Sequence, residues 1–550
     1  MNKNLVVVLI TTFVTSLVDA AENPRTWERY DESDDLALLA EHENERMHFQ
    51  LLNSKVLDKN FLWAPFAEDL ANFSETDYLS MKSMILDRSI SELQQSVSSG
   101  VLTYEQLVTF YIYRIREIES DNSRYLNGVI SLNPDAIIRA RRLDEVRQLG
   151  TSILADSIFG IPVLLKDNIN AAGMATTAGA VALQNNFTDN AFIAERLREK
   201  GAVIIGKANL SEWAYFFCND CPSGYSAMGG QTLNPYGRFQ FGTGGSSSGS
   251  GASTAANYAT VAVGSETSGS ILSPSSANSL VGLKPTTGSI SRTGVVPISA
   301  SLDTAGPMTR SVADLVILFN AMAGYDATDT AMPLISADMQ LVYREVSLVG
   351  KRLGAQVRYA DNEFYQNALM LLSANEASIV EVSFEAQRQP QFGEFLGVEM
   401  KRDLALYLEQ HAAEEVLIDS IGSLKLFNEQ DMDLRAPYGQ AEVDMMDELN
   451  YSGVEIEELR AELQDNARFQ LDSIFEDLDI EVLVSVNNQQ ASIAALANYP
   501  ALTIPMGYEE DGRPIGITFI APPFQEQLLI DVGVQFERLI EARRTPADYM

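Results

Sequence analysis

The spacing of polar and apolar residues predicts two helices at the start of the main body of the chain. Residues 89–92 (S-I-S-E) and 103–106 (T-Y-E-Q) are capping boxes, which satisfy the first backbone N–H groups of a helix. Gly100 is expected to end the first of these two helices. In the second, apolar residues recur at helical spacing and predict a face packed on a core; they are Leu107, Phe110, Tyr111 and Ile115.

Short, continuous apolar runs predict strands that are buried on both faces. Residues 163–165 (V-L-L) follow a proline, and residues 202–205 (A-V-I-I) follow a helical segment at 192–200. This alternation of strand and helix predicts an α/β domain. The same patterns give the last elements of the chain, which are strands at 500–505 and 516–521 and a helix at 525–541.

Two acidic regions differ from this apolar body. Residues 22–88 have an irregular pattern, and we expect a helical extension that packs on the main domain. Residues 330–480 are acidic, amphipathic and mostly helical in pattern. This second region is expected to form an outer layer that shapes the substrate pocket.

Residues 1–21 have the pattern of a secretory signal. Lys3 gives a positive start, residues 5–18 form an apolar run, and residues 18–20 (V-D-A) form a small-residue cleavage pattern. The run is shorter than the roughly 20 apolar residues that a membrane-spanning helix needs. We therefore expect an exported protein, periplasmic or secreted, with no stable membrane insertion after the signal is removed. An N-terminal membrane anchor is the alternative.

The chain is strongly acidic, with 75 acidic and 39 basic residues and a formal charge of −36. This charge argues against binding to nucleic acid and to anionic membrane surfaces. A solvated acidic shell is the first interpretation, and attraction of cationic substrates is the second.

Cysteine and histidine are scarce. Cys218 and Cys221 are the two cysteines, and a zinc site would need more soft ligands near them, so we expect neither a metal nor a cofactor. The cysteine pair can form a disulfide, act as a redox pair or stay free, and we favour a structural role. The three histidines, His42, His48 and His411, lack a promising setting for a serine triad, which directs attention to another base.

A Gly/Ser-rich stretch, residues 244–270, is the strongest candidate for chemistry. It begins with G-G-S-S-S-G-S-G and ends with a second Gly–Ser pair, and the segment between them is small and apolar. That segment predicts a tightly packed helix running into a buried strand, so Ser246 and Ser270 at its two ends are expected to meet. Two other interpretations of the stretch fit less well. A flexible linker would join polar stretches, whereas this one lies in a mostly apolar region. A phosphate-binding loop would be followed by Gly-Lys-Ser/Thr, which is absent here.

Lys166 is the candidate base. A serine nucleophile needs a base within hydrogen-bond reach, and lysine can serve if burial lowers its pKa by several units from about 10.4. Lys166 ends the apolar strand at 163–165, which favours burial. The adjacent Asp167 is expected to point to the opposite face of the strand. An exposed lysine at a sheet edge is the alternative.

These residues stand in motifs that resemble the amidase signature family of serine hydrolases. The motifs are V-L-L-K-D-N-I at Lys166, G-G-S-S-S-G-S-G from Gly244 and G-S-E-T-S-G-S-I from Gly264, with a family-like spacing of 24 residues between Ser246 and Ser270 (270 − 246). The resemblance runs from about residue 89 to the C-terminus, and it is densest over 160–314. It implies an amidase domain at 89–550, with a large mixed, twisted β-sheet covered by helices on both faces.

The resemblance also implies a Ser–cis-Ser–Lys triad. Ser270 corresponds to the nucleophile, Ser246 to the bridging serine and Lys166 to the base. Ser246 would follow a cis peptide bond from Gly245, and Ser247 would support Lys166 from behind.

In the family, backbone N–H groups of the turn before the nucleophile bind the oxyanion of the tetrahedral intermediate. The resemblance assigns this role to Thr267, Ser268, Gly269 and Ser270. Two positions depart from the family. Most members have Gly or Ala where Ser268 stands, or Asp in peptide amidases, and many have Arg where Leu272 stands.

Within the family, the chain is most similar to bacterial peptide amidases. We therefore expect hydrolysis of peptide C-terminal amides, or of small acyl or aryl amides, with release of ammonia or an amine. The expected partner is a small-molecule or peptide amide, with no nucleic acid. The alternatives are a membrane-associated fatty-acid amide hydrolase, an amidotransferase acting on charged tRNA, and a non-catalytic binding protein on the same scaffold; the export signal and the acidic charge argue against the amidotransferase.

Overall fold

A computed structural model describes residues 25–333, 339–387 and 389–550. The expected signal segment, residues 1–21, and the alternative membrane anchor within it lie outside these residues. Within the described part of the chain, no helix has both the length and the apolar character that crossing a bilayer requires.

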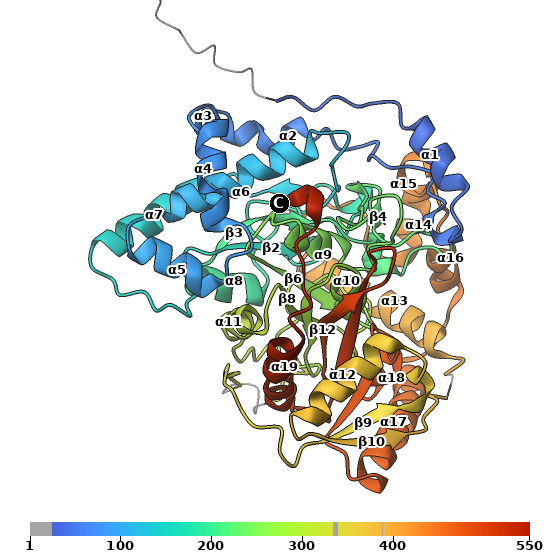
Figure 1. Cartoon of the computed structure of the whole chain (residues 1–550). Coiled ribbons are helices and arrows are strands. Elements are labelled where there is room, and N and C mark those ends of the chain that lie inside the picture. Colours follow the sequence, from blue (N-terminus) through green and yellow to red (C-terminus); the bar gives the residue numbers. More distant parts are fainter. Residues whose placement is uncertain (1–24, 334–338, 388) are drawn as a thin grey trace, which may run out of the picture.

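The centre of the molecule is one mixed sheet of 11 strands, in the order β1-β3-β2-β6-β8-β7-β12-β13-β11-β9-β10. Helices flank this sheet, which confirms the predicted fold class (Figure 1). The strands are β1 (Val129–Leu132), β2 (Pro162–Lys166), β3 (Val203–Ala208), β6 (Val261–Glu266), β7 (Val281–Lys284), β8 (Thr304–Thr309), β9 (Arg352–Gln356), β10 (Ser378–Val382), β11 (Val482–Val486), β12 (Ala501–Tyr508) and β13 (Pro514–Ile520). A separate two-stranded hairpin comprises β4 (Tyr225–Ser226) and β5 (Gly230–Gln231).

Four helices of the main body lie close to where the sequence predicts them: α5 (Ile90–Ser98), α6 (Tyr104–Glu119), α8 (Phe192–Glu199) and α19 (Glu526–Ile540). Both predicted capping boxes are present, with Ser89 capping α5 and Thr103 capping α6. The main body also contains α7 (Ala136–Gln148), α9 (Ser248–Ala255), α10 (Leu272–Ala277), α11 (Val312–Met322) and α18 (Ala491–Leu496).

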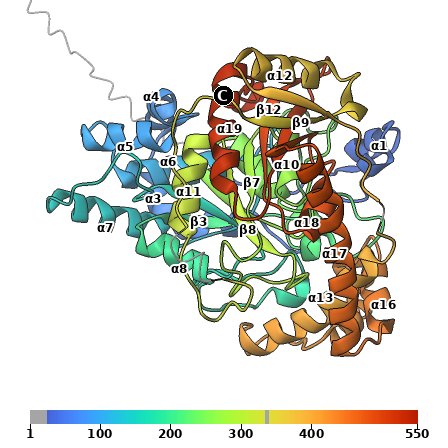
Figure 2. The same ribbon diagram turned by 90° about the horizontal axis from the view of Figure 1, so that it is seen from below.

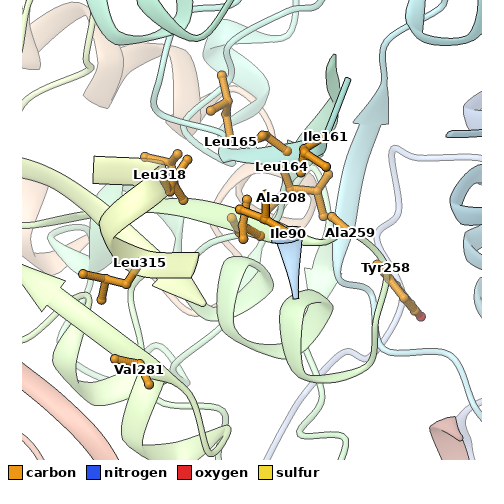
Figure 3. Close-up of a cluster of buried hydrophobic side chains, with 14 of the residues drawn as sticks. Ile90, Ile161, Leu164, Leu165, Ala208, Tyr258, Ala259, Val281, Leu315 and Leu318 are labelled. Carbon is orange, nitrogen blue, oxygen red and sulfur yellow. The ribbon is translucent and has the colours of Figure 1, made fainter. Parts of the chain in front are cut away.

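Strand β2 lies inside the sheet, between β3 and β6, and runs parallel to both. All five of its residues are buried, as the continuous apolar run predicts. Figure 3 shows Leu164 and Leu165 of this strand within the hydrophobic core. Because β2 is covered on both faces, a side chain at its carboxyl end is shielded from water.

The region 330–480 combines an outer helical layer with two strands of the central sheet. Figure 2 shows α13, α16 and α17 gathered at one corner of the molecule. The mostly helical pattern did not indicate β9 and β10, which pair in parallel at the edge of the sheet. Strand β9 (R-L-G-A-Q) has polar residues at both ends, and β10 is largely exposed or half-buried, so the apolar signal of a buried strand is weak in both. The helices of this region are α12 (Glu363–Ala374), α13 (Phe392–Gln410), α14 (Ile421–Glu429), α15 (Met432–Arg435), α16 (Ala441–Glu448) and α17 (Gly453–Asp477).

Residues 25–88 contain four α-helices that lie against the main body (Figure 1). Lys59 reaches into the protein and forms an ion pair with Glu119 of α6 at 2.8 Å, with both side chains buried. Because an unpaired buried charge is costly, this pair ties the N-terminal segment to α6 in one arrangement. The four helices are α1 (Ser33–Ala40), α2 (Asn60–Trp63), α3 (Ala67–Ala71) and α4 (Glu75–Ile85).

Candidate active site

The two serine-bearing loops meet at the carboxyl ends of β2 and β6. As predicted, the small apolar segment forms α9 and then β6, so the chain returns across the domain between Ser246 and Ser270. The backbone N–H of Ser247 donates to the carbonyl oxygen of Ser270 at 3.1 Å, which joins the two loops directly. Lys166 ends β2, the parallel neighbour of β6, and its side chain is fully buried.

Lys166 makes three polar contacts. Its Nζ lies 2.7 Å from Oγ of Ser246 and 3.0 Å from both the carbonyl oxygen and Oγ of Ser265. The ammonium form can donate to all three oxygens. The neutral amine has two N–H donors for the Ser265 oxygens, which leaves its lone pair for the hydroxyl proton of Ser246. The pocket therefore accommodates both protonation states of the lysine.

Burial lowers the pKa of Lys166 to about 7, although the carboxylates of Asp303 and Glu266 oppose this shift. Burial also raises the pKa of Asp303 to about 6, against hydrogen bonds from Thr267 and from the backbone of Ser299 and Ile298. A substantial share of Lys166 is thus neutral near pH 7.

Asp167 does not face this site. Its carboxylate lies 2.9 Å from Nζ of Lys207, and both side chains are fully buried. Successive side chains of a strand point to opposite faces, so the neighbouring charge is paired elsewhere, as the sequence predicts.

The turn that carries Ser270 is held by the carboxylate of Glu266. This carboxylate accepts hydrogen bonds from the backbone N–H groups of Gly269 at 2.7 Å, Ile271 at 2.7 Å and Leu272 at 3.0 Å. Gly269 has φ of +82°, a left-handed conformation that favours glycine. The turn is therefore fixed by three charge-assisted hydrogen bonds and one glycine.

This arrangement changes the predicted set of oxyanion donors. The N–H of Gly269 is occupied by Glu266, so Gly269 shapes the turn but offers no free donor. The backbone N–H groups of Thr267, Ser268 and Ser270 make no hydrogen bond with another described residue. Three of the four predicted residues thus retain an available donor in one short turn.

Ser270 itself is 8% exposed, and within the described residues its hydroxyl makes no hydrogen bond. The structure therefore brings Lys166 into contact with Ser246, and brings the two serine loops together, while the Ser270 hydroxyl is left without a partner among these residues. No histidine lies among the hydrogen-bond partners of Lys166 or Ser246 in the described chain.

The surroundings of Ser246 agree in part with the sequence. The Gly245–Ser246 peptide bond is cis, as expected. A β-carbon at Gly245 would lie 2.3 Å from Oγ of Ser223 and 2.7 Å from Oγ of Ser211, so a larger residue there would displace these hydroxyls. Ser247 does not touch Lys166 directly; its hydroxyl donates at 3.1 Å to the carbonyl oxygen of Ser265, which also accepts from Nζ of Lys166. Ser247 therefore acts on Lys166 only through Ser265.

Sequence reasoning missed Ser265, Glu266 and Asp303 as parts of the site. Ser265 and Glu266 lie in the G-S-E-T-S-G-S motif at the end of β6, so their position beside the turn that carries Ser270 was a usable signal. Asp303 precedes β8, and only the pairing of β8 with β6 brings it near Lys166. No local pattern predicts that pairing.

Cys218 and Cys221 form a disulfide with their Cα atoms 5.5 Å apart. Of the three alternatives for this pair, the structure shows the disulfide. The segment that contains it adjoins the site, because Ser211 donates its N–H to the carbonyl oxygen of Ser246 at 3.0 Å and accepts from the N–H of Gly224 at 2.9 Å.

Comparison with known families decides the identity of the fold and its chemistry. The sequence profile of the amidase family matches residues 106–480, more than half of the chain. The chain belongs to the amidase signature family. As a member of this family, it is a hydrolase that acts on amides.

Other amidases are similar over almost the whole domain. A probable amidase from Arabidopsis thaliana is 35% identical over 486 residues, which cover 85% of this chain and 93% of the relative. The structure of an amidase family protein from Bacillus anthracis has a TM-score of 0.84 and 33% identity, covering 90% of this chain and 99% of that one. The native peptide amidase from Stenotrophomonas maltophilia has a TM-score of 0.75 and 36% identity, covering 84% and 98%.

The two departures from the amidase signature pattern occupy different surroundings. Leu272 is 1% exposed and lies in an apolar cluster that includes Trp213 and Ile298. Ser268 is half-buried, and its Oγ donates to Oγ of Ser492 in α18 at 3.1 Å. Neither replaces a polar contact of Lys166 or Ser246.

Proposed function

We propose that this amidase hydrolyses the C-terminal amides of peptides through Ser270, Ser246 and Lys166. The observation that carries the proposal is the 2.7 Å contact between a fully buried lysine amine and the hydroxyl of Ser246. Because burial brings the pKa of Lys166 to about 7, the amine can both take up and return a proton near neutral pH.

In the proposed acylation step, Oγ of Ser270 attacks the carbonyl carbon of the carboxamide. The Ser270 proton passes to Oγ of Ser246, whose own proton passes to Nζ of Lys166. The carbonyl oxygen becomes an oxyanion, which the free N–H groups of Thr267, Ser268 and Ser270 are available to bind.

The tetrahedral intermediate then collapses. The C–N bond breaks, and the proton held by Lys166 returns through Ser246 to the leaving nitrogen, which departs as ammonia. A water molecule attacks the resulting ester, passes its proton along the same path, and releases the carboxylic acid with Ser270 restored. All protons and electron pairs are supplied by substrate, water and these three side chains.

Two observations support peptide amides as the substrate class. Peptide amidases share 36% identity with this chain over 84% of its length, and one of them is solved with the competitive inhibitor chymostatin. Helix α18 also lies against the turn that carries Ser270, and α17 of the outer helical layer packs on α18, so that layer borders the site. A fatty-acid amide hydrolase is the alternative on the same chemistry.

The experiment is ammonia release from N-acetyl-L-phenylalaninamide by purified protein. Wild-type protein should release ammonia and react with a fluorophosphonate probe, while Ser270→Ala should do neither. Lys166→Ala should also lose hydrolysis while keeping its fold. Hydrolysis that survives Ser270→Ala would overturn the proposed nucleophile, and hydrolysis of long-chain amides alone would overturn the substrate class.

We also propose that the protein is exported, on the pattern of residues 1–21. N-terminal sequencing of mature protein should give a start near Ala21. A retained apolar segment would contradict this and would favour the membrane-associated lipid amidase.

A further inference from the structure

The first turn of α18 and the residues before it lie against the nucleophile turn. Residues 487–492 (N-N-Q-Q-A-S) follow β11 and are more than 200 residues from Ser270 in sequence. A β-carbon at Gly269 would lie 3.2 Å from Nδ2 of Asn488 and 3.3 Å from Cβ of Ala491. The absence of a side chain at Gly269 thus allows Asn488 to approach the residue next to Ser270.

Unlike Asn487 and Gln490, Asn488 has no side-chain hydrogen-bond partner among the described residues. Asn487 accepts a hydrogen bond from the N–H of Gly516 at 2.8 Å, and Gln490 donates to Oε1 of Gln356 at 2.8 Å. The side chain of Asn488 is half-buried and makes no hydrogen bond with any other described residue. It therefore holds a free carboxamide, with one acceptor and two donor hydrogens, beside the nucleophile turn.

The position of Asn488 relative to Ser246 indicates which part of a substrate it meets. The leaving nitrogen must lie near Ser246, because its proton arrives from there. The loop that carries Ser246 is bordered by Ser211 and Ser223, which lie against Gly245. Residues 487–492 instead approach the turn that carries Ser270, at Ser268 and Gly269. Asn488 is thus placed for the acyl side of the scissile bond.

The side chains of residues 487–492 determine which chemical group of a substrate they could bind. Residues 487–492 carry no ionisable side chain, so they offer no ion pair to a charged substrate. A carboxamide can donate to a peptide carbonyl and accept from a peptide N–H. A peptide amide has such a peptide unit next to the carbon that Ser270 attacks, whereas a fatty or aryl amide has none.

We propose that Asn488 binds the peptide unit on the acyl side of the scissile amide and so selects N-acylated amino-acid amides over simple amides. This inference rests on the proposed function and specifies the substrate of that same site.

The test uses two substrates that differ only in this peptide unit, N-acetyl-L-phenylalaninamide and 3-phenylpropanamide. Asn488→Ala should lower kcat/KM for the acetylated substrate about tenfold, the effect of losing one or two neutral hydrogen bonds. It should change kcat/KM for 3-phenylpropanamide less than about twofold. Asn488→Leu, which keeps the approximate size but carries no hydrogen-bonding group, should show the same selective loss.

Gln489→Ala is the matched control, because Gln489 is the adjacent, exposed carboxamide. It should leave both substrates unaffected, and thermal unfolding should show that all variants fold. An equal loss on both substrates would show that Asn488 only shapes the turn, and no loss on either would show that it does not touch substrate; each result overturns the inference. A wild-type enzyme that hydrolyses only 3-phenylpropanamide would instead overturn the proposed peptide substrate together with this contact.

Discussion

At the scale of single residues, the protonation of Lys166 controls the proposed chemistry. Burial favours the neutral amine, while the carboxylates of Asp303 and Glu266 favour the ammonium. The balance of these effects places the pKa near the pH at which a base must both accept and release a proton.

The first prediction concerns Asp303→Asn. Removing this carboxylate removes an interaction that stabilises the Lys166 ammonium, so the pKa of Lys166 should fall. The acidic limb of the kcat/KM profile should therefore move to lower pH, by about 0.5–1 unit. The measurement is the pH dependence of ammonia release from an uncharged peptide amide.

Asp314→Asn provides the matched control. Burial raises the pKa of Asp314 to about 6, as it does for Asp303, but Asp314 lies at the start of α11 and does not perturb Lys166. This variant should leave the acidic limb of the kcat/KM profile at the pH of the wild-type protein. A limb that stays fixed or rises in Asp303→Asn would contradict the assigned interaction.

Sequence alone indicated Lys166, Ser246 and Ser270, because each stands in a continuous motif. It did not indicate the residues that complete their surroundings. Ser265 contacts Lys166 because β6 pairs with β2, and Asn488 lies beside Gly269 because the start of α18 packs against that turn. Such contacts depend on the packing of remote segments, which no local pattern specifies.

At the scale of elements, the turn between β6 and α10 carries Ser270 and the candidate oxyanion donors. Glu266, the last residue of β6, binds three backbone N–H groups of that turn through one carboxylate. The carboxylate also leaves the N–H groups of Thr267, Ser268 and Ser270 free of partners among the described residues. The strand thus positions both the proposed nucleophile, Ser270, and the candidate oxyanion donors.

The second prediction is that Glu266→Gln distorts this turn. The new NH2 group would face backbone donors, so at least one charge-assisted hydrogen bond is lost and one N–H is left unpaired. We expect kcat to fall about a hundredfold, and the free energy of unfolding to fall by about 2 kcal/mol. Steady-state kinetics and urea unfolding measure the two effects.

Glu510→Gln is the control, because Glu510 is exposed in the turn between β12 and β13. It should change neither quantity. Unchanged kcat in Glu266→Gln would show that the turn does not depend on the carboxylate.

The sheet shows where element prediction succeeds and fails. The continuous apolar run of β2 and the late strands β12 and β13 were predictable, because buried strands are uniformly apolar. Strands β9 and β10 were not, because β9 (R-L-G-A-Q) has polar residues at both ends and the edge strand β10 is largely exposed or half-buried, within an acidic, helix-rich region.

At the scale of the whole molecule, the formal charge of −36 is the dominant property. Like charges on a compact surface repel one another and destabilise the folded state. The surface ion pairs offset this repulsion only weakly, since exposed pairs contribute about 0–1 kcal/mol each.

The third prediction is that salt stabilises the protein. Raising the NaCl concentration from about 0.02 M to about 0.5 M shortens the Debye length to a few ångström and screens the repulsion. The melting temperature from differential scanning calorimetry should rise by several degrees. A melting temperature that falls with NaCl would show that favourable ion pairs outweigh the net repulsion.

The most direct test of the central claim is the pH dependence of kcat/KM for wild-type protein with N-acetyl-L-phenylalaninamide, an uncharged substrate. Because only neutral Lys166 can accept the proton, activity should rise with pH through an apparent pKa of about 7 and then level off. Activity that is independent of pH between about 5 and 9 would show that the titration of Lys166 does not control the reaction, and would contradict the account.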